Sequence, residues 1–242
     1  MQKPASRRFG VSLSWHFLAL LLFAGSLLFG SGSAKASWSV DPVLRKAEKR
    51  YGRSGPANDR LQAWHDLLEG SRRKSEQEQL QAVNQQINRQ VRFSDDSELW
   101  QRRDYWATPV ETLARGAGDC EDFALAKYFT LLQLGVDPQK LRITYARALK
   151  LNQAHMVVTY YETPDAEPLV LDNLVDDILP ASQRKDLALR YAFDAQGLYA
   201  MDHGALKRIG EPTELRPWQV VLTRMERQGF HLASVQSQSA GG

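Results

Sequence analysis

Hydrophobic residues recur at helical spacing between residues 40 and 100. Leu80, Val83, Ile87 and Val91 follow one another at intervals of three, four and four residues, which places them on one face of a helix. This stripe predicts an amphipathic helix near Ser75–Val91, even though the segment is rich in glutamine.

Two earlier helices are predicted from the residues at their ends. Asp41-Pro42 supplies a cap and a first-turn proline for a helix over Val43–Tyr51, and Gly52 ends it. A second helix is expected from about Asn58 to Glu69, with Gly70 as its end.

The pattern changes after residue 120. The segment Glu121–Gly135 is hydrophobic on almost every side, which predicts a helix buried among other elements. Three runs rich in β-branched and aromatic residues then predict strands at Leu141–Leu149, Ala154–Glu162 and Leu169–Val175. The turn at 163–168 contains two prolines and two acids, so the second and third strands are expected to pair antiparallel.

The C-terminal part predicts a hairpin and a last helix. Residues 191–193 and 198–200 flank a turn at 194–197, and a helix is expected over 216–228. The expected elements thus combine a helical N-terminal half, a buried central helix and antiparallel strands.

A leader precedes this domain. Lys3, Arg7 and Arg8 come before an apolar run over Val11–Phe29, and Ala34-Lys35-Ala36 matches the small-residue pattern of a cleavage site. These features predict a signal peptide at residues 1–36. The run is also long enough for an uncleaved membrane anchor, but the cleavage site that follows directly favours removal, and no stable membrane insertion is expected afterwards.

Removing the leader changes the charge of the chain. The leader holds four of the 31 Lys and Arg residues and none of the 28 Asp and Glu residues, which leaves 27 basic against 28 acidic residues. This balance provides no electrostatic surface for nucleic acid or an anionic membrane. One domain is expected over 37–233, and the small polar residues 234–242 predict a disordered tail.

Cys120 is the only cysteine, within the sequence Gly-Ala-Gly-Asp-Cys-Glu-Asp, so an exported chain cannot form an internal disulfide. It lies at the predicted start of the buried helix. The free amides and partial positive charge of a helix N-terminus lower a thiol pKa and favour a nucleophile. A lone cysteine is also often an inert core residue, so its surroundings decide.

His155 and Asp172 follow in two of the predicted strands. Antiparallel strands bring them together if the register places them opposite each other or two residues apart. His155 would then take the proton of Cys120, and Asp172 would orient the imidazole. Each has an ordinary alternative, as a core thiol, a strand histidine or a turn carboxylate. The ordered set favours a thiol hydrolase or acyltransferase.

Three acids surround the thiol: Asp119, Glu121 and Asp122. Their charge raises a thiol pKa, although acids in a first helical turn also complement the helix dipole. Three carboxylates within four residues suit a hard cation as well, and a ligand set without His or Cys favours calcium over zinc. Both the dipole and the calcium interpretation stay open at this level.

Aromatic residues gather upstream of Cys120, at Trp100, Tyr105 and Trp106. They fit the wall of a substrate groove or a cover over the nucleophile helix equally well. Trp100 and Trp106 are also weak candidates for an oxyanion donor. Thr108-Pro109 then predicts the cap and first turn of a short helix.

Several motifs together resemble the bacterial transglutaminase-like cysteine proteinases of the LapG family. They extend over most of residues 38–230, at 105–113, 118–124, 127–128, 154–157, 169–174, 180–184, 191–193 and 197–199. The resemblance implies a papain/transglutaminase-like α+β fold. It also implies a periplasmic cysteine endopeptidase that cuts large LapA-like surface adhesins near their N-terminus at a dialanine-type site, which releases the adhesin and disperses biofilm.

The same resemblance implies specific roles. It places a catalytic triad on Cys120, His155 and Asp172, and it associates calcium dependence with Asp119 and Glu121, whereas Asp122 is added from its spacing alone. It further implies an inner-membrane cyclic di-GMP receptor of the LapD type as a regulatory partner.

Two alternatives stay open. A transglutaminase would use the same triad but pass the acyl group to an amine. A silent binding module would need a damaged triad, and all three triad residues are present.

Overall fold

The structure, a computed structural model, describes residues 40–202 and 205–232. The predicted signal peptide at 1–36 and the predicted tail at 234–242 lie outside the described residues. The described residues all fall in the unit Lys35–Gly242, and the expected domain bounds of 37–233 stay a prediction.

Three helices open the described chain: α1 (Asp41–Tyr51), α2 (Pro56–Ser71) and α3 (Glu76–Gln90). α1 ends at Gly52, which has φ 92° as expected of a glycine that stops a helix. α3 begins with a capping box in which Ser75 and Glu78 bond to each other's backbone amides.

The prediction for α2 was too short at both ends. Pro56 occupies the first turn, and the helix runs through Gly70 to Ser71. Ser71 is fully buried, and its backbone carbonyl accepts a hydrogen bond of 3.0 Å from the side-chain amide of Gln79. Packing against α3 therefore holds the last turn in place, and this outweighs the weak helix propensity of glycine.

Two short elements lead to the central helix. α4 (Asp96–Leu99) is a single turn, and α5 (Pro109–Arg115) begins at the predicted Thr108 cap. α5 ends at Gly116, with φ 65°, where a Cβ would lie 2.6 Å from Cζ of Arg60. Arg60 needs that space because its guanidinium bonds the carbonyls of Leu113 and Ala114 at the end of α5.

A parallel pair of two-residue strands, β1 (Arg92–Phe93) and β2 (Ala117–Gly118), was not predicted from the sequence. The amide of Ser94 extends the pairing by donating to the carbonyl of Gly118 at 3.0 Å. This pairing brings the segment before α4 alongside the segment that leads into the central helix.

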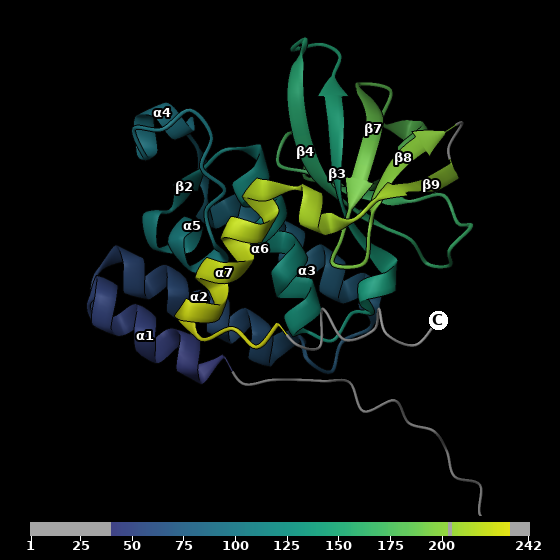
Figure 1. Ribbon diagram of the computed structural model, residues 1–242. Helices are drawn as coiled ribbons and strands as arrows, with labels where there is room; N and C mark the ends of the chain where they lie inside the picture. Colours follow the sequence, from purple (N-terminus) through teal and green to yellow (C-terminus); the bar gives the residue numbers. More distant parts are fainter. Residues whose placement is uncertain (1–39, 203–204, 233–242) are drawn as a thin grey trace, which may run out of the picture. The chain divides into compact units, whose positions relative to one another are not determined.

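The central helix, α6 (Cys120–Gln133), is buried along nearly its whole length, as its continuous hydrophobic sequence predicts. Figure 1 shows α6 between the other helices and the sheet. Tyr128 and Phe129 pack against Trp218 of α7 (Arg216–Gln228) with ring centroids 6.0 and 5.5 Å apart. The helix therefore starts at the sheet and is fixed by the core on its other sides.

The main sheet has seven strands in the order β6-β5-β4-β3-β7-β8-β9, all antiparallel. The bounds are β3 (Leu141–Ala148), β4 (Gln153–Tyr160), β5 (Leu169–Leu171), β6 (Leu179–Pro180), β7 (Leu187–Phe193), β8 (Leu198–Asp202) and β9 (Ala205–Gly210). The predicted hairpin at 194–197 connects β7 and β8, which pair at Phe193 and Leu198. The α+β fold predicted from the sequence is confirmed.

The strand predicted over Leu169–Val175 ends at Leu171. From Asp172 onward, side chains replace the ladder: the Asp172 carboxylate accepts from the Leu174 amide, and Asn88 of α3 donates to the Asp172 carbonyl. The chain therefore leaves the sheet at Asp172 and turns over α3.

Among the described residues, no helix combines the length and the apolar character needed to cross a bilayer.

Lys127 is a basic residue buried among the hydrophobic side chains of α6. It is 1% exposed, and its Nζ has no hydrogen-bond acceptor within the described part of the chain. Burial lowers the pKa of Lys127 to about 7, although the charges of Asp172 and Asp176 work against this.

We expect Lys127→Met to stabilise the protein most at or below pH 7. The folded pKa of about 7 lies below the usual lysine value of about 10.4, so between these values the unfolded chain binds more protons and wild-type stability rises with pH. Urea unfolding at fixed calcium should show a gain of a few kcal/mol at pH 7 that shrinks by about 1.4 kcal/mol per pH unit toward pH 10.

The exposed Lys150 provides the control, because Lys150→Met should leave stability nearly unchanged across this range. A Lys127→Met effect that does not vary with pH would contradict the burial of a titrating amine.

Candidate active site and metal centre

Cys120 is the first residue of α6, directly after the β2 strand and the Asp119 N-cap position. Gly118 is required there because a Cβ on it would lie 2.6 Å from Cβ and 2.7 Å from Oδ2 of Asp122. The glycine thus lets the first turn of α6 fold closely onto the preceding strand, with the thiol at its N-terminus.

His155 of β4 and Asp172 after β5 form a buried hydrogen bond of 2.7 Å between Nε2 and Oδ1. In the sheet Leu171 pairs with Val158, so the same register places Asp172 opposite Val157, two residues from His155. This is one of the two registers that the sequence allows for contact.

Asp172 is held by several donors. Arg184 donates to its Oδ2 at 2.5 Å, and the Leu174 amide donates to its Oδ1 at 3.1 Å. Burial alone would raise the pKa of Asp172, but the hydrogen bond and charge of His155, together with Arg184 and the Leu174 amide, lower it to about 2. Asp172 is therefore ionised at neutral pH.

An ionised carboxylate can only accept hydrogen bonds, so the Nε2 of His155 carries the proton in this pair. In the neutral ring, Nδ1 is then the basic nitrogen. Strand β4 reaches the sulfur of Cys120 at Met156, the residue after His155, because the Met156 amide is among the groups that act on the thiol. The structure thus joins His155 to Asp172 directly and brings Cys120 to the same strand.

The thiol itself donates a hydrogen bond of 3.1 Å to Oε2 of Glu121. Burial is the largest cause that raises the pKa of Cys120, followed by the charge and hydrogen bond of Glu121 and the charge of Asp119, while the Met156 amide lowers it. Burial and these acids therefore disfavour the thiolate form of Cys120.

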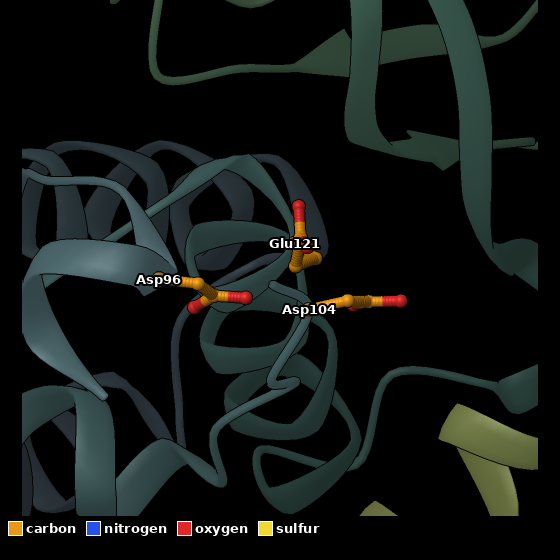
Figure 2. Close-up of side chains that lie close together, drawn as sticks. All are labelled: Asp96, Asp104 and Glu121. Atoms are coloured by element: carbon orange, nitrogen blue, oxygen red, sulfur yellow. The ribbon is translucent and has the colours of Figure 1, made fainter. Parts of the chain in front are cut away.

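Five carboxylates gather around the start of α6 in two groups that share Asp96. One group joins Asp96, Asp104 and Glu121, and the other joins Asp96, Asp119 and Asp122, each with one oxygen per residue within 4.8 Å of the others. Figure 2 shows Asp96 and Glu121 reaching the same region from α4 and α6, with Asp104 beside them. The sequence prediction grouped Glu121 with Asp119 and Asp122, whereas the structure places it with Asp96 and Asp104.

Asp96 and Asp104 were missed because no local spacing connects them to Cys120. The β1–β2 pairing brings this segment beside the nucleophile, and Asp96 then accepts a hydrogen bond from the Tyr105 amide. A long-range pairing of two residues per strand leaves no periodic signal in the sequence.

The two groups carry strong mutual repulsion. Burial is the main cause that raises the pKa of Asp96 to about 6, that of Asp119 to about 9 and that of Asp122 well above its usual value, and neighbouring acids add to each shift. These carboxylates are therefore poorly stabilised as anions without a positive partner.

Unpaired oxygens in these groups fit a hard cation. Oδ1 of Asp96, Oδ1 of Asp119 and Oδ2 of Asp122 are buried and accept no hydrogen bond from any residue that the structure describes. Buried carboxylate oxygens without donors are the ligands that calcium prefers. Asp96, Asp104, Asp119, Glu121 and Asp122 could together hold such an ion.

The aromatic residues upstream have separate positions. Trp106 stacks on Phe193 with centroids 5.7 Å apart and packs against the same hydrophobic core as Cys120. Trp100 lies against Tyr105 at 4.5 Å, and its buried indole N–H has no acceptor among the described residues. Trp106 is thus part of the cover over α6, and Trp100 keeps a donor available.

A family model described as bacterial transglutaminase-like cysteine proteinase matches residues 63–191 of the chain. Among solved structures, EGTA-treated LapG of Legionella pneumophila is 40% identical, with a TM-score of 0.69 over 78% of this chain and 98% of that one. Calcium-bound LapG of the same organism is 42% identical, with a TM-score of 0.65 over 75% and 98% of the two chains. No match to a curated protein was found.

We expect Asp96→Asn to weaken calcium binding by roughly one to two orders of magnitude, because this residue belongs to both carboxylate groups. Isothermal titration of the chelator-treated protein with calcium measures the effect. The matched control is Asp95→Asn, which removes the same charge from an exposed neighbour and should change the affinity little. Equal affinities for the two variants would exclude Asp96 as a ligand.

We expect Asp172→Asn to slow the alkylation of Cys120 by iodoacetamide at neutral pH by about a hundredfold, the scale of losing a positioned base. The Asn amide would donate to Nε2, which moves the imidazole proton to Nδ1 and removes the base. Because Cys120 is the only cysteine, the label reports this site alone.

The control for this experiment is Asp186→Asn. Asp186 also pairs with Arg184, at 2.8 Å, but His155 bonds Asp172 and not Asp186. A loss of similar size in both variants would mean that Asp172 acts only through general stability.

Proposed function

Because the chain belongs to the family of bacterial transglutaminase-like cysteine proteinases, we propose that it is a calcium-dependent cysteine endopeptidase with Cys120, His155 and Asp172 as its triad. One observation carries this assignment. The buried 2.7 Å bond from His155 to Asp172 leaves Nδ1 as the base on the strand that meets the thiol.

The proposed reaction begins with proton transfer from Cys120 Sγ to His155 Nδ1. The thiolate attacks the scissile carbonyl, and backbone amides at the start of α6 face the oxyanion. The imidazolium then returns its proton to the leaving amine, and an acyl-enzyme remains on the sulfur. A water molecule, deprotonated by Nδ1, releases the acid and restores the thiol.

Asp172 and Arg184 keep the imidazole in position during these steps. Arg184 is 2% exposed and bonds both Asp172 and Asp186, so it fixes the carboxylate from the side opposite His155. An ionised Asp172 stabilises the imidazolium by direct charge contact.

Calcium would be held by residues of the two carboxylate groups, Asp96, Asp104, Asp119, Glu121 and Asp122. Unpaired buried oxygens of Asp96, Asp119 and Asp122 fit such an ion. When bound, it supplies positive charge that offsets these carboxylates beside the thiol. Related LapG of Legionella pneumophila is known both calcium-bound and EGTA-treated, which supports calcium as the ion. Glu121, the acceptor of the thiol hydrogen bond, belongs to this ligand set.

The substrate, location and partner rest on the family resemblance. We infer that the enzyme acts in the periplasm after export by the signal peptide at 1–36. Its substrate is the N-terminal region of a LapA-like surface adhesin, cut at a dialanine-type site, and cleavage releases the adhesin and promotes biofilm dispersal. An inner-membrane cyclic di-GMP receptor of the LapD type would sequester it. Similarity to LapG along 78% of the chain supports this assignment.

Cleavage of an adhesin N-terminal fragment tests the proposal. We expect purified residues 37–242 to cut the fragment once in calcium, to lose activity in excess EGTA, and to recover it when calcium is restored. Cys120→Ala should abolish cleavage, since no other thiol is present. Full turnover by Cys120→Ala would remove the thiol from the mechanism, and full turnover in EGTA would remove calcium.

A second arm separates the alternatives. A glutamine peptide incubated with a primary amine should give no cross-linked product, since the proposed acceptor is water. Efficient amine incorporation without peptide cleavage would instead favour a transglutaminase. Binding of the fragment without any reaction would favour a silent binding module.

A further inference from the structure

A cleft of about 560 Å³ lies between the segment that precedes α5 and the first three turns of α7. Trp106, Pro217 and Val220 form apolar parts of its lining, and Arg102, Asp104 and Arg216 are charged groups at it. The proposed mechanism uses none of the residues that α7 contributes.

One lining residue, Asp104, connects this cleft to the surroundings of the proposed nucleophile. Asp104 lines the cleft, and its carboxylate lies within 4.8 Å of that of Glu121, which accepts the thiol hydrogen bond. A chain bound with its scissile carbonyl at Cys120 would therefore pass the cleft within about four residues, at roughly 3.3 Å per extended residue.

The arginines that line the cleft differ in whether they form an ion pair with a carboxylate. Arg224 is held by Glu111 at 2.9 Å and by the carbonyl of Trp106, and it stacks over Tyr105. Arg102 also lies over the Tyr105 ring, 5.5 Å from its centroid. Arg102 and Arg216 are exposed, and neither forms an ion pair with a carboxylate of residues 40–202 or 205–232. Two guanidinium groups thus remain available to a ligand.

We propose that this cleft is a specificity subsite for an acidic side chain of the substrate, a Glu or Asp near the scissile bond. The apolar lining packs against the aliphatic part of that side chain, while Arg102 and Arg216 bond its carboxylate. Guanidinium groups bind carboxylates in a planar, two-point geometry, which favours an acid over a neutral amide. The proposal rests on the proposed endopeptidase function and narrows its substrate class.

A peptide panel tests the subsite. Starting from a cleaved adhesin peptide, each position within four residues of the scissile bond is changed to Glu, Gln or Lys, and kcat/KM is measured with calcium present. We expect one position where Glu is preferred over Gln by about tenfold or more. The preference should fall below about twofold in the Arg102→Gln/Arg216→Gln double variant and weaken at high salt.

The controls separate binding from folding. Arg103→Gln alters an exposed neighbour that does not line the cleft and should keep the preference. In the double variant, cleavage of the Gln peptide should fall far less than cleavage of the Glu peptide, whereas a general loss of folding would lower both equally. Arg216→Glu should favour the Lys peptide at that same position, which a loss of stability would not produce.

Two results would overturn the subsite: a Glu preference that survives in the double variant, or cleavage of all peptides with no position that prefers Glu. If wild type cleaves no peptide and no adhesin fragment, the endopeptidase function fails, and the subsite fails with it.

Discussion

The site depends on the buried hydrogen bond between His155 and Asp172. Asp172 lies where β5 leaves the sheet, and Arg184, the Leu174 amide and Asn88 hold its carboxylate and its backbone. The hydrogen bond and charge of His155, followed by Arg184 and the Leu174 amide, outweigh burial and lower the pKa of Asp172. The ionised carboxylate assigns a proton of His155 to Nε2, which leaves Nδ1 as the basic nitrogen of the neutral ring. The orientation of the base on β4 is thus decided by contacts from α3, the turn after β5 and the segment after β6.

The acids around Cys120 oppose this arrangement in the absence of metal. Glu121 accepts the thiol hydrogen bond, and burial with the nearby acids raises the pKa of the sulfur. The same carboxylates have buried oxygens without donors, so one cluster both restrains the nucleophile and offers a cation site. Repulsion among these carboxylates is unfavourable without a cation, and binding of a cation would relieve it. This provides a physical basis for control of the thiol by an ion.

Local sequence patterns predicted helices well where one face of the helix, or the whole helix, is buried. The hydrophobic sequence after Cys120 predicted α6, and the residues at 216–228 predicted α7. The predicted end of α2 was wrong because the buried Ser71 packs against α3 and accepts a hydrogen bond from the Gln79 side chain. The strand predicted at 169–175 was too long because side-chain hydrogen bonds replace the strand pairing at Asp172. For the metal centre, Asp96 and Asp104 depend on the long-range β1–β2 pairing, which no periodicity reveals.

The tautomer of His155 tests the central claim most directly. Nitrogen-15 NMR of the imidazole in the calcium-free protein distinguishes its two nitrogens, with His155→Gln used for assignment. The account predicts that, at a pH where the ring is neutral, the proton lies on Nε2 in the bond to Asp172 and Nδ1 is unprotonated. A neutral ring that carries its proton on Nδ1 would contradict the account, because no base would then remain for the thiol.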